Sequence, residues 1–112
     1  MELGVERLKE LLEQGDVQLV DVREDDEHEA GHLPGDRHVE LAQVAASAHS
    51  FDRERPLVFY CRSGQRSAMP AEAFREAGYD AYNLDGGIVA WQKAGLPLEP
   101  GGGRVIDRAP LP

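Results

Sequence analysis

The sequence has only one cysteine, Cys61, in 112 residues. One thiol cannot close a disulfide within the chain, so Cys61 is either an inert core group or a reactive group kept reduced by the cytosol. Its position at the start of a small polar loop favours the reactive interpretation.

Long apolar runs are also missing. No stretch approaches the roughly 20 residues that a membrane-spanning helix needs. The start, residues 1–6, has neither the basic n-region nor the apolar h-region of a secretory signal. We therefore expect a cytoplasmic protein. Its 112 residues, 41% of them hydrophobic, predict one domain with a modest core.

Basic residues are in the minority, and the net charge is −9. Such a charge repels phosphate backbones and anionic lipid, which argues against nucleic acid and membrane as partners. Arg62 and Arg66 nevertheless lie next to the single cysteine, where they form a local positive spot. A spot of this size suits a small anion better than an extended polyanion.

The apolar run Leu57–Tyr60 predicts a buried strand, and the segment from Ser67 to Ala77 predicts the helix that follows it. Cys61 then lies at the carboxyl end of a strand and faces a helix N-terminus, where ligands bind in open α/β sheets. Backbone donors, the helix dipole and nearby cations all favour a thiolate. Pro70 predicts a kink or a late start of the helix.

The remaining pattern alternates strands and helices, which predicts an α/β fold with a mainly parallel sheet covered on both faces. Residues 1–97 form the expected domain, and residues 98–112 form a Gly/Pro-rich tail that Val105 and Ile106 would anchor. The expected elements are a helix over 5–14, a strand over 17–22, a loop over 21–27, a turn over 31–35, a short helix over 40–49, a strand over 80–84 and a helix over 88–94.

Polar residues stand at the carboxyl end of the predicted strand over 17–22. Asp21 and Arg23 share the sheet edge predicted for Cys61, and we expect them to support the site structurally, since carboxylates at strand ends usually satisfy backbone donors or an arginine. His28, His32 and His38 invite comparison with a metal site. Their spacing is irregular and no second cysteine is available, so we predict no metal.

The loop from Cys61 to Arg66 is a cradle in which a cysteine could form a covalent intermediate. Three reactions suit it: sulfur transfer through a persulfide, phosphate ester hydrolysis through a phosphocysteine, and arsenate reduction. In the cysteine phosphatase pattern an arginine stands six positions after the cysteine. Here Ser67 takes that position, and Tyr60 replaces the histidine that usually precedes the cysteine. The shorter loop favours a single extra sulfur over a phosphate.

With these motifs established, the chain resembles the rhodanese family, in particular its single-domain members. The resemblance implies a three-layer α/β/α domain with a central, mainly parallel sheet of about five strands. It also implies thiosulfate sulfurtransferase activity, in which a cysteine passes sulfane sulfur from an anionic donor to an acceptor without metal or organic cofactor. The motifs that carry it are residues 19–24, 31–35, 61–67, 83–87 with Trp91, and 95–97.

Carried over residue by residue, the resemblance makes Cys61 the nucleophile that accepts sulfur. Backbone amides from Arg62 through Ser67 would hold the persulfide, with Gly64 allowing tight curvature and Gln65 inside the cradle. Arg62 and Arg66 would attract the anionic donor, although an ion pair with an acidic neighbour is the alternative for Arg66. The hydroxyls of Ser63 and Ser67 would donate to sulfur.

Three positions depart from the family pattern. His28 stands where an aromatic residue is common, Asp36 where a small residue is common, and Pro70 in a helix usually free of proline.

The sequence leaves the sulfur acceptor open: it could be cyanide, a thiol or a sulfur-accepting protein. A persulfide carrier that works mainly through a partner protein is the alternative to an enzyme for small molecules. A phosphatase or arsenate reductase of related fold is the third possibility.

Overall fold

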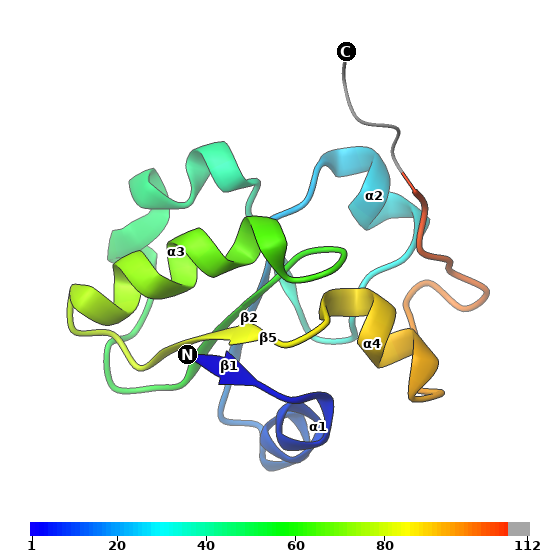
Figure 1. The fold of residues 1–112 in the computed structure, drawn as a ribbon, viewed down its shortest axis with the longest axis horizontal. Coiled ribbons are helices and arrows are strands. Elements are labelled where there is room, and N and C mark those ends of the chain that lie inside the picture. The colour runs from blue at the N-terminus through cyan, green and yellow to red at the C-terminus, as the bar shows by residue number, and fades with distance from the viewer. Residues whose placement is uncertain (108–112) are drawn as a thin grey trace.

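The computed structural model describes residues 1–107. They form a five-stranded sheet with the strand order β1-β5-β4-β2-β3, in which all pairs are parallel. Figure 1 shows α3 and the 3-10 helices on one side of the strands and α1 on the other. The elements are β1 (Glu2–Leu3), α1 (Val5–Gln14), β2 (Gln18–Asp21), α2 (Asp25–Ala30), β3 (Arg37–His38), η1 (Leu41–Gln43), η2 (Ala45–Ser50), β4 (Leu57–Tyr60), α3 (Gln65–Glu76), β5 (Ala81–Leu84) and α4 (Gly87–Lys93). The predicted α/β/α architecture with a parallel sheet is confirmed.

The central strand β4 is buried along its whole length and divides the core into two clusters. Alternate side chains point to opposite faces of a strand, so Leu57, Phe59 and Cys61 pack with Phe74 of α3. Val58 and Tyr60 pack on the other face with the leucines of α1 and with Ile88 and Trp91 of α4. Both faces are therefore apolar, as a parallel sheet between two helical layers requires.

The register places the cysteine beside the end of the neighbouring strand. Asp21 is the last residue of β2 and pairs with Tyr60, which directly precedes Cys61. The backbone N–H of Val22 donates to the carbonyl of Tyr60 at 3.0 Å. The sulfur loop, defined as Cys61–Ser67, and the polar residues after β2 therefore share one edge of the sheet.

The segment 40–49, expected as one short α-helix, is a correction. It forms two 3-10 helices, η1 and η2, separated by the buried Val44. Alanine favours any helical backbone, but the segment lacks the apolar stripe of a long α-helix, and the tighter 3-10 turns suffice to pack Val44 on the core.

The acidic stretch after β2, expected to be a loop through residue 27, contains a helix instead. The helix α2 begins at Asp25 with a capping box: the Glu24 side chain accepts from the N–H of Glu27, and the Glu27 side chain accepts from that of Glu24. Acidic side chains also suit the positive end of a helix dipole. A glutamate followed three residues later by another was the sequence signal.

Pro70 does not delay the helix that follows the cysteine. The helix α3 begins at Gln65 and runs through Pro70, which is buried. The expectation of a late start is therefore wrong. Ala71 and Phe74 of α3 pack against the sheet, and this packing outweighs the single backbone hydrogen bond that proline cannot donate.

The described part of the expected tail lies against the domain. Glu99 exchanges backbone hydrogen bonds with His32, and the N–H of Arg104 donates to the carbonyl of Ala30. Leu98 and Val105 pack against the α1–α4 cluster. The rest of the expected tail, residues 108–112, lies outside the described residues.

Candidate active site

The sulfur of Cys61 lies inside the curve of the sulfur loop, and the residue is 1% exposed. The backbone N–H of Gly64 donates to Sγ at 3.1 Å, and Oγ of Ser67 lies 3.3 Å from Sγ. Gly64 has a φ of 101°, in the left-handed region that favours glycine, so the chain can turn back toward the sulfur.

These contacts favour the ionised form of Cys61. Burial alone raises the pKa of the thiol, but hydrogen bonds from the Ser67 hydroxyl and from the N–H groups of Ser67, Gly64 and Ser63 outweigh it. The pKa of Cys61 therefore lies below its ordinary value. A thiolate at this position is available as a nucleophile.

The first residues of α4 close the back of the sulfur loop. The N–H of Ile88 donates to the carbonyl of Cys61 at 3.0 Å, and that of Val89 to the carbonyl of Arg62 at 3.1 Å. A side chain at Gly87 would bring a Cβ within 2.5 Å of both carbonyl oxygens. In the sequence, Gly86 and Gly87 belong to the family motif over residues 83–87. In the structure, the absence of a side chain at Gly87 leaves room for the carbonyls of Cys61 and Arg62, which accept hydrogen bonds from outside the loop.

The two arginines predicted to attract an anion have different surroundings. Arg66 forms a two-point ion pair with Glu27 of α2, with both N–O distances at 2.8 Å. The Glu27 side chain is fully buried and that of Arg66 is 38% exposed. The alternative predicted for Arg66, an ion pair with an acidic neighbour, is therefore observed. Arg66 also raises the positive potential near Cys61. The sequence did not identify Glu27 as the partner of Arg66, because it is one of 21 acidic residues.

Arg62 is the less committed of the two cations. Its side chain is 37% exposed, and its Nε lies 3.8 Å from Oδ1 of Asp107. That Nε is buried without a hydrogen-bond partner among the described residues. Ser63 and Gln65, the other predicted binding residues, are exposed. The structure therefore leaves Arg62 as the loop guanidinium best placed to meet a small anion.

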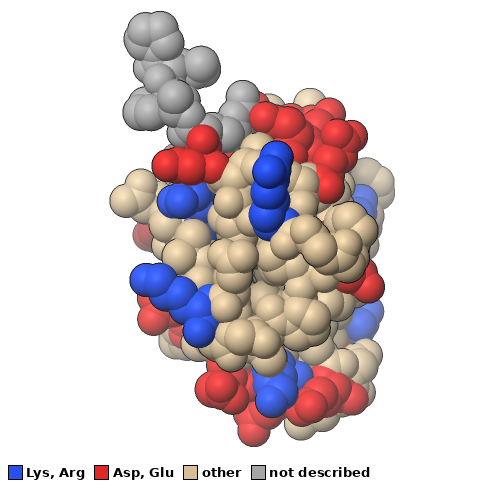
Figure 2. Space-filling model, turned by 90° about the vertical axis from the view of Figure 1, so that its right-hand side faces the viewer, with Lys and Arg blue, Asp and Glu red and all other residues tan. Residues whose placement is uncertain are grey.

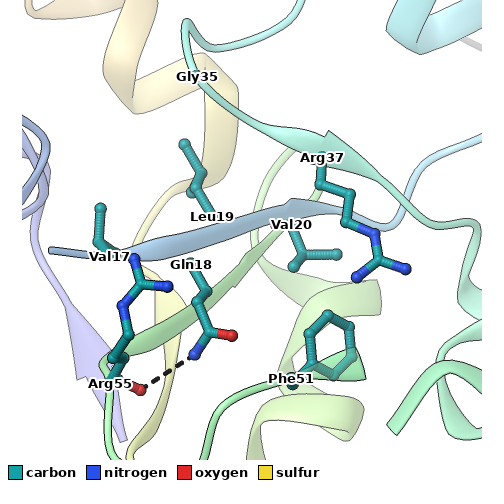
Figure 3. A pocket seen from close by; sticks show the side chains of 8 residues that line it. All are labelled: Val17, Gln18, Leu19, Val20, Gly35, Arg37, Phe51 and Arg55. Atoms are coloured by element: carbon teal, nitrogen blue, oxygen red, sulfur yellow. Dashed lines mark hydrogen bonds between the residues drawn. The ribbon is translucent and has the colours of Figure 1, made fainter. Parts of the chain in front are cut away.

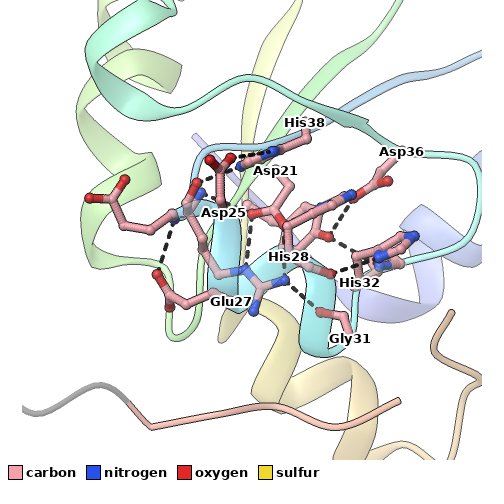
Figure 4. A network of polar contacts seen from close by, with 12 residues as sticks. Asp21, Asp25, Glu27, His28, Gly31, His32, Asp36 and His38 are labelled. Atoms are coloured by element: carbon pink, nitrogen blue, oxygen red, sulfur yellow. Dashed lines mark hydrogen bonds and ion pairs between the residues drawn. The ribbon is translucent and has the colours of Figure 1, made fainter. Parts of the chain in front are cut away.

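Asp21 and Arg23 form a buried ion pair beside the sulfur loop, although Nη1 of Arg23 has no hydrogen-bond partner among the described residues. Nε and Nη2 of Arg23 donate to the two carboxylate oxygens of Asp21 at 2.9 Å, and both side chains are fully buried. His28 adds a contact of 2.9 Å to the same carboxylate. Burial raises the pKa of Asp21, but the Arg23 bonds outweigh it and the pKa is lowered. We call Asp21, Arg23 and His28 the Asp21 network (Figure 4).

Three histidines that fall close together in the sequence also stack in space. The His28 ring lies between those of His32 and His38, with centroid distances of 3.9 and 4.4 Å and nearly parallel planes. His28, His32 and Asp36 bring ligand atoms within 4.8 Å of one another. Imidazole lone pairs lie in the ring plane, so stacked rings cannot aim them at one ion without turning. This stack also accounts for a histidine where the family often has an aromatic residue.

Asp36, another departure from the family pattern, has a clear partner. The Tyr60 hydroxyl donates to the Asp36 carboxylate at 2.6 Å and accepts from the N–H of Leu33 at 3.0 Å. The side chain of Asp36 is 3% exposed. It therefore fastens the 31–36 turn to the central strand immediately before Cys61.

Two hollows differ in their position relative to the cysteine. One of about 310 Å³ lies beside the sulfur loop and is lined by Val22, Glu24, Leu41, Ala42 and Arg66. The other, of about 210 Å³, lies at the opposite end of the strands, because its Gln18 pairs with the first residue of β4 (Figure 3). Its volume is below the roughly 300 Å³ of small ligand pockets.

Figure 2 shows the face toward which the carboxyl ends of the strands point. Acidic side chains gather at its upper and lower margins, and basic side chains lie between them on a largely uncharged surface.

Within residues 1–107, no helix has the length and apolar character to cross a membrane.

Comparison with known proteins agrees with this geometry. A model of the rhodanese-like domain matches residues 4–94. Thiosulfate sulfurtransferase GlpE of Pseudomonas aeruginosa strain PAO1 is 36% identical over 91 residues, which cover 80% of this chain and 82% of that protein. A crystal structure of a rhodanese-like domain protein from Staphylococcus aureus is 32% identical, with a TM-score of 0.74 over 80% of this chain and 89% of that one.

A further relative is much longer than the region that matches this chain. An HTH-type transcriptional regulator of Mycobacterium tuberculosis is 39% identical over 92 residues, which are 80% of this chain but only 40% of that protein. The family model, by contrast, covers most of the present chain. The chain belongs to the family of rhodanese-like domains.

Proposed function

We propose that this protein is a thiosulfate sulfurtransferase that carries sulfane sulfur as a persulfide on Cys61. The observation that carries the proposal is the buried Sγ, which receives hydrogen bonds from N–H groups of the sulfur loop. The similarity to proteins named as thiosulfate sulfurtransferases supports the same reaction class. A reduced thiol is required, which agrees with the expected cytoplasmic location.

The reaction has two balanced half-reactions. The Cys61 thiolate attacks the outer sulfur of thiosulfate, a bond forms between the two sulfurs, and the S–S bond of the donor breaks with its electron pair leaving on sulfite. The persulfide then carries the negative charge on its terminal sulfur. Cyanide or a thiolate attacks that sulfur, and Cys61 leaves as a thiolate. Dividing one transfer in this way lowers the barrier of each step.

The loop residues act on charge in these steps. Arg62 meets the incoming anionic donor, and Arg66 contributes a positive potential that its pairing with Glu27 reduces. The N–H groups of Ser63, Gly64 and Ser67 stabilise the thiolate and are placed to stabilise the persulfide anion. No cofactor or metal has a step in this sequence.

The test is a mass measurement on the intact protein after incubation with thiosulfate. The protein should gain the mass of one sulfur atom, and cyanide should remove that mass and release thiocyanate. The Cys61→Ser variant is the matched control and should gain nothing. Absence of an adduct with thiosulfate and with inorganic polysulfide would overturn the proposal.

A persulfide carrier that delivers sulfur to a partner protein is the second candidate. It is favoured by the relative in which the matched region is only 40% of a longer regulator. Slow transfer to cyanide together with rapid transfer to one protein would support it. Rapid turnover with small acceptors would count against it.

Phosphoryl chemistry fits the geometry less well. The position that would carry the phosphate-binding arginine is Ser67, which is fully buried, and the nearby Arg66 is bound at two points to Glu27. Hydrolysis of an aryl phosphate that depends on Cys61 would be needed to revive a phosphatase or an arsenate reductase.

A further inference from the structure

Asn83 of β5 is a buried side chain directly behind the sulfur loop, and it is 2% exposed. Its Nδ2 donates to the carbonyl of Gly64 at 2.9 Å and to the Glu2 carboxylate at 3.0 Å. Its Oδ1 lies 2.5 Å from the hydroxyl oxygen of Ser67. One amide thus holds the middle and the end of the loop that surrounds Cys61.

These contacts fix the orientation of the amide. The Gly64 carbonyl and the Glu2 carboxylate can only accept, so the NH₂ group of Asn83 must face them. The amide oxygen then faces Ser67. Because that oxygen cannot donate, the Ser67 hydroxyl must supply the proton of the 2.5 Å hydrogen bond.

The Ser67 hydroxyl has a second neighbour that can also use its proton. Sγ of Cys61 lies 3.3 Å from the same oxygen. A hydroxyl has only one proton, so the sulfur and the Asn83 oxygen compete for it. The competition depends on charge, because a thiolate is a stronger acceptor than an amide, whereas a neutral sulfur is a weaker one.

We propose that Asn83 is a positioning residue that shares the single proton of Ser67 with Cys61. When Sγ is a thiolate, the Ser67 hydroxyl turns toward the sulfur. When Sγ carries no charge, the hydroxyl turns back to Asn83. The Gly64 contact keeps the loop in place while the proton changes partner, so the exchange needs no movement of the backbone.

This inference rests on the proposed function for its place in turnover. Formation of the persulfide moves the negative charge from Sγ to the terminal sulfur, so Sγ no longer needs the Ser67 proton. Transfer to the acceptor returns the charge to Sγ as the bond between the two sulfurs breaks. Asn83 thereby provides a resting partner for Ser67 in the persulfide state and prevents an unsatisfied buried hydroxyl.

The experiment compares Ser67→Ala in two backgrounds, the natural sequence and Asn83→Ala. The readout is the pH dependence of Cys61 alkylation by iodoacetamide, which reports the fraction of thiolate and requires no sulfur transfer. In the natural background Ser67→Ala should raise the apparent pKa of Cys61 by a few tenths of a pH unit. In the Asn83→Ala background it should raise that pKa by about one pH unit, since the hydroxyl is then free to donate to sulfur.

A second variant separates the amide oxygen from the loop anchor. Asn83→Asp keeps an acceptor for Ser67 but loses the donors to Gly64 and Glu2, so the effect of Ser67→Ala should stay as small as in the natural background. Tyr82→Phe, on the same strand, removes a hydroxyl that contacts Asp80 and should change nothing. Thermal unfolding shows which variants are folded.

Two results would overturn the inference. One is an equal effect of Ser67→Ala in the natural and Asn83→Ala backgrounds. The other is a large effect in the Asn83→Asp background, which decides the matter if Asn83→Ala does not fold. Because alkylation does not involve a sulfur donor, failure of the mass measurement under Proposed function would leave this experiment interpretable.

Discussion

Two polar regions lie side by side at the carboxyl edge of the sheet, the sulfur loop and the Asp21 network. In the network, the two fully buried charges of Asp21 and Arg23 neutralise each other. In the sulfur loop, N–H groups and the Ser67 hydroxyl converge on the sulfur of Cys61. The comparison teaches that burial alone does not mark a site: the Asp21 carboxylate is already bound by Arg23 and His28, while the loop has donors that an anionic sulfur can use.

Contacts from β5 and from the start of α4 explain how the loop keeps this arrangement. Donors from outside the loop, in Asn83, Ile88 and Val89, bind its carbonyls. The carbonyl dipoles therefore point away from the sulfur. An unsupported loop could turn one of its carbonyls toward Cys61, which would disfavour the thiolate.

The largest effect on stability should come from breaking the Asp21 network. Asp21→Ala leaves the Arg23 guanidinium buried with only the Gly31 carbonyl as a strong partner, and it should lower the free energy of unfolding by about 3–5 kcal/mol. Urea denaturation measures this loss. Asp16→Ala, which breaks the exposed pair with Arg55, is the control and should cost at most about 1 kcal/mol. Equal losses would contradict the comparison.

Displacing the sulfur loop from behind should have the next largest effect. Gly87→Ala places a Cβ 2.5 Å from the carbonyls of Cys61 and Arg62 at a φ of 60°, and it should cost about 2–3 kcal/mol. Sulfur uptake should fall with it, about tenfold or more. Gly95→Ala has a similar φ of 77° but nothing within 4 Å. It should cost about 1 kcal/mol and leave uptake intact.

The ion pair between Arg66 of the sulfur loop and Glu27 of α2 should show in the acid dependence of stability. Burial raises the pKa of Glu27, but the Arg66 bonds outweigh it, so the folded pKa lies below the ordinary value of 4.5. The stabilisation is therefore present above pH 4.5 and is lost as the pH falls through the folded pKa.

Glu27→Gln removes this contribution. It should cost about 1–2 kcal/mol at pH 7, and the gap to the natural protein should narrow as the pH falls below 4.5. Urea denaturation at several pH values measures the gap. Glu10→Gln, in the exposed pair with Arg7, is the control and should show no such narrowing. A gap that stays constant down to pH 3 would show that Glu27 is not linked to folding in this way.

The smallest effect on stability should come from Arg62→Ala, because its contact with Asp107 is long, at 3.8 Å, and the Asp107 side chain is 81% exposed. Its unfolding free energy should change by less than about 0.5 kcal/mol. The KM for thiosulfate should nevertheless rise about threefold to tenfold, and the difference should shrink at high salt. Arg7→Ala, a cation on α1, should leave KM unchanged. Steady-state kinetics at two salt concentrations would decide between these outcomes.

The apolar run Leu57–Tyr60 and the polar loop after it predicted where in the fold the candidate site lies. The apolar residues of β4 have no other place than the core, and the polar loop after Cys61 must then emerge at the sheet edge. The expected helices over 5–14 and 88–94 correspond to α1 and α4, because their apolar periodicity and terminal glycines are local signals. Local patterns also misled, since alanine content predicted an α-helix where η1 and η2 form.

The fold class, the position of the single cysteine at the end of a strand and the small polar loop after it followed from residue types that are adjacent in the chain. The partners of those residues followed only from the packing of distant segments. Arg66 and Glu27 are 39 positions apart, and Asn83 is 16 positions from Ser67. Contacts over such separations depend on which strands are neighbours, and no local pattern encodes that choice.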